Sequence, residues 1–191
     1  IHCWYDGTMI LGAKGQFSGG IVGNVKSGTV TMSNCLFSKS ITGGGTTNVL
    51  GFGGLVGQIA GGTLRINDSL VSGTVTKESA NGSNRFGSFV GYLVGGALEI
   101  SNTYSHNAMA SGYVIRRNGG GTIKYNGTQL NVASTYINGV KPVNYAEALP
   151  AANLKGDNAL NTGLDFTNHW QVVEGGFPVL KNPISGATIG K

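Results

Sequence analysis

Three stretches of the chain repeat one pattern at a spacing of 34 residues, and this repeat constrains the fold more than any other feature. The copies run over 19–35, 53–69 and 87–103. Glycines and apolar residues fall at the same places in each copy, as at Gly23, Gly57 and Gly91 and at Val30, Leu64 and Leu98. A fixed period of this size indicates an array in which each repeat buries its apolar face against its neighbours.

Within one copy, apolar residues alternate with polar ones. Over 63–67, this alternation predicts a half-buried strand with Leu64 and Ile66 pointing inward. Two further strands are predicted at 54–59 and 69–76, because glycine pairs and an Asn-Asp pair, which favour turns, separate the three segments. The many glycines and β-branched residues disfavour a helix.

Three short strands per repeat can be stacked in two main ways. A propeller blade usually has four strands and about 40 or more residues. In a parallel β-helix each repeat is one coil, and equivalent strands pair about 4.8 Å apart. The 34-residue repeat is shorter than a propeller blade and therefore favours the β-helix. We expect an all-β chain with a parallel β-helix (β-solenoid) of about four to five coils over 1–140, followed by a small irregular C-terminal cap over 141–191.

The ends of the array differ from its middle. Residues 77–86 predict a polar loop, and 113–126 contain a degraded fourth coil that lacks this loop. A short helix is predicted over 144–153. The apolar residues that we expect to cover the open end of the solenoid are Trp170, Phe177, Val179 and Leu180. Because residues 2–6 align with 34–38, the chain begins inside a coil, and we expect it to be part of a larger multidomain chain.

Composition excludes several classes of protein. Glycine accounts for 34 of 191 residues but does not recur every third position, which excludes collagen, and 40% apolar content argues against disorder. The net charge of +5 is dispersed, with Arg116-Arg117 as the only adjacent basic pair, so nucleic-acid binding is not predicted. No apolar run reaches the roughly 18 residues of a membrane span.

The repeat resembles a known motif. Gly54-Leu55-Val56-Gly57, continued through Thr76, is similar to the GLUG motif, a family of short repeats named for its Gly-Leu-Val-Gly-like core. Weaker copies cover 20–42 and 88–110, and 170–180 looks like the close of such arrays. The resemblance implies a bacterial, secreted or surface-attached, adhesin-like protein. Such repeats also occur beside the catalytic domain of immunoglobulin A metalloproteases, but the zinc signature His-Glu-x-x-His is absent from this chain.

Two cysteines occupy equivalent positions in successive coils. Stacking would place Cys3 and Cys35 about 4.8 Å apart, inside the Cα range that a disulfide accepts. The alternative is an internal ladder of small buried residues, since Ser69 and Thr103 hold the same position in later coils. Both interpretations remain open from the sequence.

One column of residues is predicted to point outward from the coils. It contains Trp4, Leu36, Leu70 and Tyr104. Exposed aromatic rings beside polar groups suit the recognition of sugars or proteins, so Trp4, Tyr104 and His106 are candidate ligand-binding residues. The favoured alternative is that loops carrying Phe52 and Phe86 cover this face.

Other reactive groups give weaker signals. His2, His106 and His169 are too far apart for a shared zinc ion, so no metal site is predicted. An oxygen-rich segment, with Asp157, Asn158, Asn161 and Asp165, matches no calcium loop, and a solvated loop is favoured.

Paired carboxylates would be needed for glycoside hydrolysis. Asp68 and Glu99 fall on adjacent coils, but one lies at a corner and the other in mid-strand, so a catalytic pair is not predicted. We expect a non-catalytic extracellular module without cofactors, acting as a rigid stalk or as an adhesion surface for a host protein or glycan. The alternative is a polysaccharide-active enzyme built on a β-helix.

Overall fold

The chain is all-β. The computed structural model describes residues 3–5, 7–11, 17–43, 51–77, 86–105, 113–118, 120–125, 128–129, 137–138 and 151–181. Within these ranges nearly all regular structure is strand, and the helices are two 3-10 segments, η1 (Ala151–Leu154) and η2 (Gly156–Thr162). In the described part of the chain, neither helix is long and apolar enough to cross a membrane.

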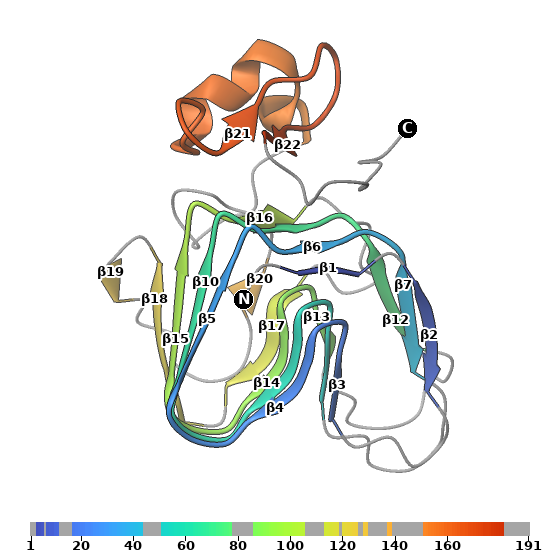
Figure 1. The fold of residues 1–191 in the computed structure, drawn as a ribbon, viewed down its shortest axis with the longest axis vertical. Helices are drawn as coiled ribbons and strands as arrows, with labels where there is room; N and C mark the ends of the chain where they lie inside the picture. The colour runs from blue at the N-terminus through green and yellow to red at the C-terminus, as the bar shows by residue number, and fades with distance from the viewer. Residues whose placement is uncertain are drawn as a thin grey trace.

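Equivalent strands of successive repeats lie side by side (Figure 1) and pair in parallel and in register. The parallel part of one sheet consists of β5 (Thr29–Ser33), β10 (Thr63–Asn67), β15 (Ala97–Ser101) and β18 (Thr122–Tyr125). Its register places Val30, Leu64, Leu98 and Ile123 in one row. For the first three copies, the 34-residue sequence alignment is therefore also the structural register. At a shorter spacing, β18 continues this register, as predicted for the strand of the degraded fourth copy.

Four further parallel sheets repeat the same arrangement. Their strands are β4 (Val22–Val25), β9 (Val56–Ile59), β14 (Val90–Leu93) and β17 (Tyr113–Asn118); β3 (Phe17–Gly19), β8 (Gly51–Gly53) and β13 (Phe86–Gly87); β2 (Thr8–Leu11), β7 (Ser40–Gly43) and β12 (Thr74–Lys77); and β1 (Trp4–Tyr5), β6 (Leu36–Phe37), β11 (Leu70–Val71) and β16 (Tyr104–Ser105). The chain passes through these sheets in the same order in each repeat.

Each full repeat contains five strands rather than the three predicted. The segment predicted as one strand over 69–76 divides into β11 and β12 at Gly73. A Cβ atom at Gly73 would lie 2.5 Å from Cε1 of Phe37 in the preceding repeat, so the backbone turns there against an aromatic ring. The strand β8 was not predicted, because its Gly-Phe-Gly sequence has no alternation.

The main core lies inside the repeats. Leu64 and Ile66 are completely buried, which confirms their predicted inward orientation. They belong to a cluster of stacked apolar side chains that also includes Met32, Ile41, Phe52, Val56, Ile59, Val71, Val90, Leu93 and Leu98. Each row of the cluster is filled by residues of the same repeat position, so removal of water from this interior stabilises every repeat through its neighbours.

Glycine allows two sheets to lie almost in contact. Gly57 in β9 and Gly91 in β14 face the layer formed by β3, β8 and β13. A Cβ atom at Gly57 would lie 2.5 Å from the backbone nitrogen of Ser18, and one at Gly91 would lie 2.6 Å from the carbonyl oxygen of Phe52. Any side chain would force these layers apart, which explains why glycine recurs at this place in the repeat.

Short antiparallel strands end two of the sheets. β19 (Thr128–Gln129) pairs with β18, and β20 (Ile137–Asn138) pairs with β17. The loop predicted over 77–86 lies mostly outside the described residues, as does most of the helix predicted over 144–153; only 151–153 of the latter are described, and they belong to η1.

The C-terminal segment, residues 151–181, contains η1, η2 and a short antiparallel pair, β21 (Trp170–Gln171) and β22 (Val179–Leu180). Figure 1 shows this segment, in orange and red, above the sheet that contains β6 and β16. The prediction that it covers the open end of the array is wrong. It packs sideways, because the apolar column on the outer face of β6, β11 and β16 offers a surface to bury.

Candidate functional site

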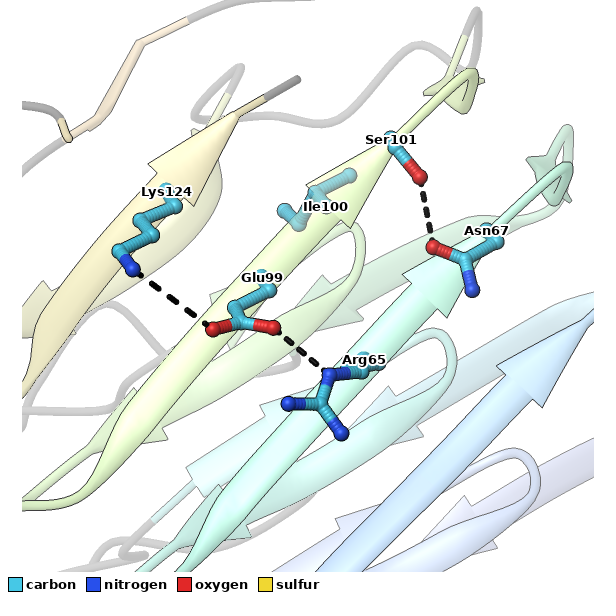
Figure 2. A pocket seen from close by; sticks show the side chains of 6 residues that line it. All are labelled: Arg65, Asn67, Glu99, Ile100, Ser101 and Lys124. Atoms are coloured by element: carbon cyan, nitrogen blue, oxygen red, sulfur yellow. Dashed lines mark hydrogen bonds and ion pairs between the residues drawn. The ribbon is translucent and has the colours of Figure 1, made fainter. Parts of the chain in front are cut away.

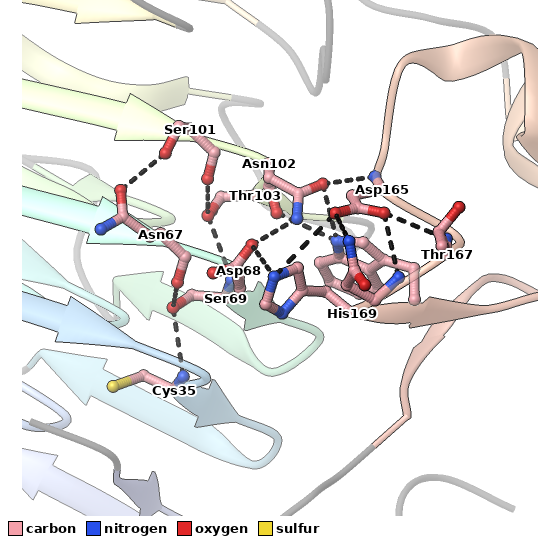
Figure 3. Close-up of polar contacts among 12 residues, drawn as sticks. Cys35, Asn67, Asp68, Ser69, Ser101, Asn102, Thr103, Asp165, Thr167 and His169 are labelled. Carbon is pink, nitrogen blue, oxygen red and sulfur yellow. Dashed lines mark hydrogen bonds and ion pairs between the residues drawn. The ribbon is translucent and has the colours of Figure 1, made fainter.

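A column of Asn and Asp residues forms the corner after β5, β10 and β15. Asn34, Asp68 and Asn102 hold this position and have backbone φ angles of 52°, 48° and 47°. Asn and Asp adopt this left-handed region more readily than other non-glycine residues, because their short polar side chains bond locally. Nδ2 of Asn102 donates a hydrogen bond to Oδ1 of Asp68. The corner therefore presents stacked amide and carboxylate groups (Figure 3).

The C-terminal segment attaches to the last member of this column. Oδ1 of Asn102 accepts hydrogen bonds from the backbone N–H of Asp165, at 2.7 Å, and from Nε1 of Trp170, at 3.0 Å. The same indole nitrogen lies 3.0 Å from the backbone oxygen of Asn102. Trp170 is completely buried, and a buried indole N–H needs a partner. Asn102 thus shapes the corner and also anchors the segment.

Two carboxylates and a histidine lie beside this anchor. Nε2 of His169 is 3.8 Å from Oδ1 of Asp68 and 4.0 Å from Oδ2 of Asp165. Oδ1 of Asp165 accepts the backbone N–H groups of Thr167 and Asn168 at 3.0 Å, and its Oδ2 accepts Nδ2 of Asn168 at 2.8 Å. These bonds, led by those from Asn168, lower the pKa of Asp165. Asp165 is therefore a carboxylate at neutral pH.

The contact between the C-terminal segment and the repeats, here called the junction, also has an apolar part. It buries the column that was expected to bind ligand. Its members are Leu36, Leu70, Tyr104, Leu164, Trp170 and Leu180, with Phe166 packed at the margin. The rings of Tyr104 and Trp170 have centroids 4.9 Å apart and are tilted by 55°. The hydroxyl of Tyr104 donates to the backbone oxygen of Pro178. Burial raises the pKa of Tyr104 well above its ordinary range.

The expectation that Tyr104 is an exposed ligand-binding residue is therefore wrong. The column does point away from the main core, but the C-terminal segment covers it. The alternative expectation, that loops carrying Phe52 and Phe86 cover this face, is also wrong for Phe52, which belongs to the main core. Trp4 pairs with Leu36 through its backbone; its side chain, the side chain of Phe86, and His106 lie outside the described residues.

A second polar surface lies on the outer face of β10, β15 and β18 (Figure 2). Nε of Arg65 lies 2.7 Å from Oε2 of Glu99, and Nζ of Lys124 lies 4.0 Å from its Oε1. Next to them, Oγ of Ser101 donates to Oδ1 of Asn67 at 2.6 Å. These five residues, here called the polar row, line a shallow hollow of about 280 Å³. In-register pairing aligns the charges across the strands.

The two cysteines lie in neighbouring repeats as predicted. The backbone N–H of Leu36 donates to the carbonyl oxygen of Cys3 at 2.9 Å, directly beside Cys35. Both are thiols in this structure; Cys35 is completely buried and Cys3 is partly buried. Burial raises the pKa of Cys35, while the backbone N–H of Cys3 lowers it by a smaller amount.

The remaining sequence candidates separate in space. Glu99 belongs to the polar row, whereas Asp68 faces the C-terminal segment. Asn158 and Asn161 line a hollow with Asn153 and Thr162, while Oδ2 of Asp165 lies 4.0 Å from Nε2 of His169. Within the described part of the chain, no three His, Cys, Asp or Glu side chains gather in a way that could hold a metal ion.

No family model, curated protein or solved structure matches the chain. Function must therefore be inferred from the residues themselves. The junction around Asn102 was missed by sequence reasoning, although one signal was present: a non-glycine turn residue, Asn or Asp, recurs at 34, 68 and 102.

Proposed function

We propose that this chain is a non-catalytic β-solenoid module of a bacterial surface or secreted protein. It would be a parallel β-helix of about four to five coils, with residues 151–181 as a lateral cap, and would belong to the GLUG-like repeats that its sequence resembles. The observation that carries the proposal is the unbroken parallel register from β5 to β18. A stack of this kind is stiff, because every coil is hydrogen-bonded to the next along its length.

The described charges favour a scaffold over an enzyme. Glu99 is paired with Arg65 and Lys124 on the outer face. Asp68 accepts a hydrogen bond from Asn102, and Asp165 is held by its own turn. Each of these acids thus has a structural partner. The partner lies either in a neighbouring repeat or within the same turn.

The polar row is the surface that we assign to adhesion. It combines guanidinium, ammonium, carboxylate, amide and hydroxyl groups on a rigid sheet, and Arg65 and Lys124 are each nearly half exposed. Such a surface can donate to and accept from the hydroxyl groups of a glycan, or meet charged side chains of a host protein. Its shallow shape suits a broad ligand of this kind better than a small enclosed one.

A polysaccharide-active enzyme is the second candidate, and one observation favours it: carboxylate oxygens of Asp68 and Asp165 both lie within 4.0 Å of Nε2 of His169. Glycoside hydrolysis, however, needs one carboxyl group that stays protonated and can act as an acid. The pKa of Asp165 is lowered, so this carboxyl group does not supply the acid. The scaffold is the better-supported proposal, because the parallel register extends through every strand from β5 to β18.

One paired experiment separates the two functions. The purified chain is screened on a glycan array and against host matrix proteins, and is separately incubated with acidic polysaccharides to measure release of reducing ends. For any ligand found, Arg65→Ala should weaken binding about tenfold if the polar row is the contact surface. Thr29→Ala, at the edge of the same sheet, is the matched control and should bind normally.

Polysaccharide release would decide for the enzyme. Asp68→Asn removes the carboxylate but should preserve the backbone, because Asn holds the same corner position in the neighbouring repeats. If the chain releases product and Asp68→Asn abolishes that release, the non-catalytic proposal is overturned. Absence of binding to any glycan or matrix protein would remove the adhesive role and leave only the stalk.

A further inference from the structure

A ladder of side chains runs along the interior corner after the Asn/Asp column. The backbone N–H of Ser69 donates to Oγ1 of Thr103 at 3.1 Å, and that hydroxyl donates to the backbone oxygen of Ser101 at 2.8 Å. One repeat earlier, the N–H of Cys35 donates to Oγ of Ser69, also at 3.1 Å. Each side chain thus points along the stack toward the backbone of the preceding repeat (Figure 3).

Cysteine replaces the hydroxyl residue at the next two positions of this ladder. Sγ of Cys35 lies 3.6 Å from the backbone oxygen of Ser33, which is the bond that Ser69 and Thr103 make in their own repeats. By the same geometry, Cys35 directs its sulfur toward the backbone of Cys3, and a bond between the two sulfurs requires the Cys3 side chain to turn toward Cys35. The influence of the Cys3 backbone and thiol on the pKa of Cys35 reflects this proximity.

We propose that Cys3 and Cys35 form a disulfide that joins the first two repeats. Residues in register on neighbouring strands have Cα atoms about 4.8 Å apart, inside the range of roughly 4.4–6.8 Å that disulfides accept. The side chain of Cys35 already points along the stack, and the chain contains no other cysteine to compete for pairing. This inference is independent of the proposed adhesive function.

The bond forms by exchange with a low-molecular-weight disulfide. Cys3 is partly exposed, so its thiolate attacks the small disulfide, a mixed disulfide forms at Cys3 and one small thiolate leaves. The thiolate of Cys35 then attacks Sγ of Cys3 and releases the second small thiolate. The two protons lost by the cysteines are taken up by the two leaving thiolates. The protein is oxidised by two electrons, and the small disulfide is reduced to two thiols.

The test equilibrates the purified chain in oxidised and reduced glutathione and then denatures it in acid. Intact mass and thiol labelling after denaturation count the remaining thiols. We expect a monomer that has lost the mass of two hydrogen atoms and takes up no label. Its melting temperature should be roughly 5–10 °C above that of the reduced protein, because the crosslink restricts the unfolded chain.

Cys35→Ser is the matched variant, because serine already occupies this ladder position at Ser69. This variant should fold, and its Cys3 should form no disulfide other than a mixed disulfide with glutathione. Its melting temperature should no longer respond to reductant. Two labelled thiols in the wild-type monomer after equilibration would overturn the proposal. So would bonds found only between separate chains, or a wild-type melting temperature that does not change on reduction.

Discussion

The indole nitrogen of Trp170 donates hydrogen bonds to both the backbone oxygen and the side-chain oxygen of Asn102, each at 3.0 Å. Through this contact, the segment 151–181 is anchored at a corner of the repeat and covers the apolar column of Leu36, Leu70 and Tyr104. The surface that looked most suitable for ligand binding in the sequence is thus an internal interface of the chain.

Loss of the anchor should release the C-terminal segment. Trp170→Ala is expected to cost about 3–5 kcal/mol at the junction, because it leaves a large cavity and removes the hydrogen bonds from the indole nitrogen to Asn102. The repeats should keep their far-ultraviolet circular dichroism, while limited proteolysis cuts within 151–181 and binding of a hydrophobic dye increases. Val173→Ala, in the same segment but partly exposed, is the control and should change stability by no more than about 0.5 kcal/mol.

Tyr104 should make the junction sensitive to alkali. Its pKa in the folded protein is raised above the ordinary value of 10.0. The folded state therefore holds this proton more tightly than the unfolded state, so the contribution is complete below pH 10 and declines as the pH rises further. Tyr104→Phe should cost about 1 kcal/mol at neutral pH, by loss of the bond to Pro178, and should flatten the alkaline decline. Chemical denaturation across the alkaline range measures both; an unchanged slope in Tyr104→Phe would contradict the assignment.

Asp165 should have the opposite pH dependence. Its pKa is lowered from 3.8 in the folded state, mainly by hydrogen bonds from Asn168. Its contribution is present above that value and is lost as the pH falls through the folded pKa. The stability difference between wild type and Asp165→Asn should therefore shrink on acidification. A difference that stays constant from neutral to strongly acidic pH would show that the charge does not matter.

The repeated glycines should differ in tolerance although they hold one sequence position. Gly91→Ala is expected to cost about 3 kcal/mol or more, because the new Cβ would lie 2.6 Å from the Phe52 carbonyl oxygen. Gly23→Ala is the matched control: its nearest atom, the carbonyl oxygen of Phe17, would be 3.3 Å away, so the cost should stay below about 1 kcal/mol. Urea denaturation of both variants measures the contrast. Equal losses of stability would contradict the tight packing of the two sheet layers.

The sequence predicted the contacts between residues that hold the same position in neighbouring repeats. Leu64 and Leu98 align at 34 residues and pair at that spacing, so their register and burial could be predicted from periodicity alone. Tyr104 could not be placed this way. The alternation of apolar and polar residues correctly predicted that Tyr104 points away from the main core. The segment that covers it, however, has no periodicity and is distant in sequence: Trp170 lies 68 residues from its partner Asn102. Single long-range contacts of this kind leave no pattern to detect.

The extra strands were missed for a local reason. Phe52 lies between two glycines, so no alternation marks β8 as a strand, yet it pairs in register with the equivalent segments of both neighbouring repeats. Such strands are held by tertiary packing rather than by propensity. The split between β11 and β12 likewise depends on Phe37 of another repeat beneath Gly73.

The most direct test of the stacked-coil account is to lengthen the array. Two further copies of residues 53–86, inserted between Phe86 and Gly87, should add two coils in register, because Gly53 and Gly87 hold the same repeat position. Small-angle scattering should show a molecule about 10 Å longer along the stack, with a melting temperature no lower than that of the parent. A scrambled insert of the same composition is the control and should behave as an unfolded, protease-sensitive loop. If the true copies are digested as readily as the scrambled insert, or the molecule does not lengthen, the repeats are not interchangeable coils and the account is wrong.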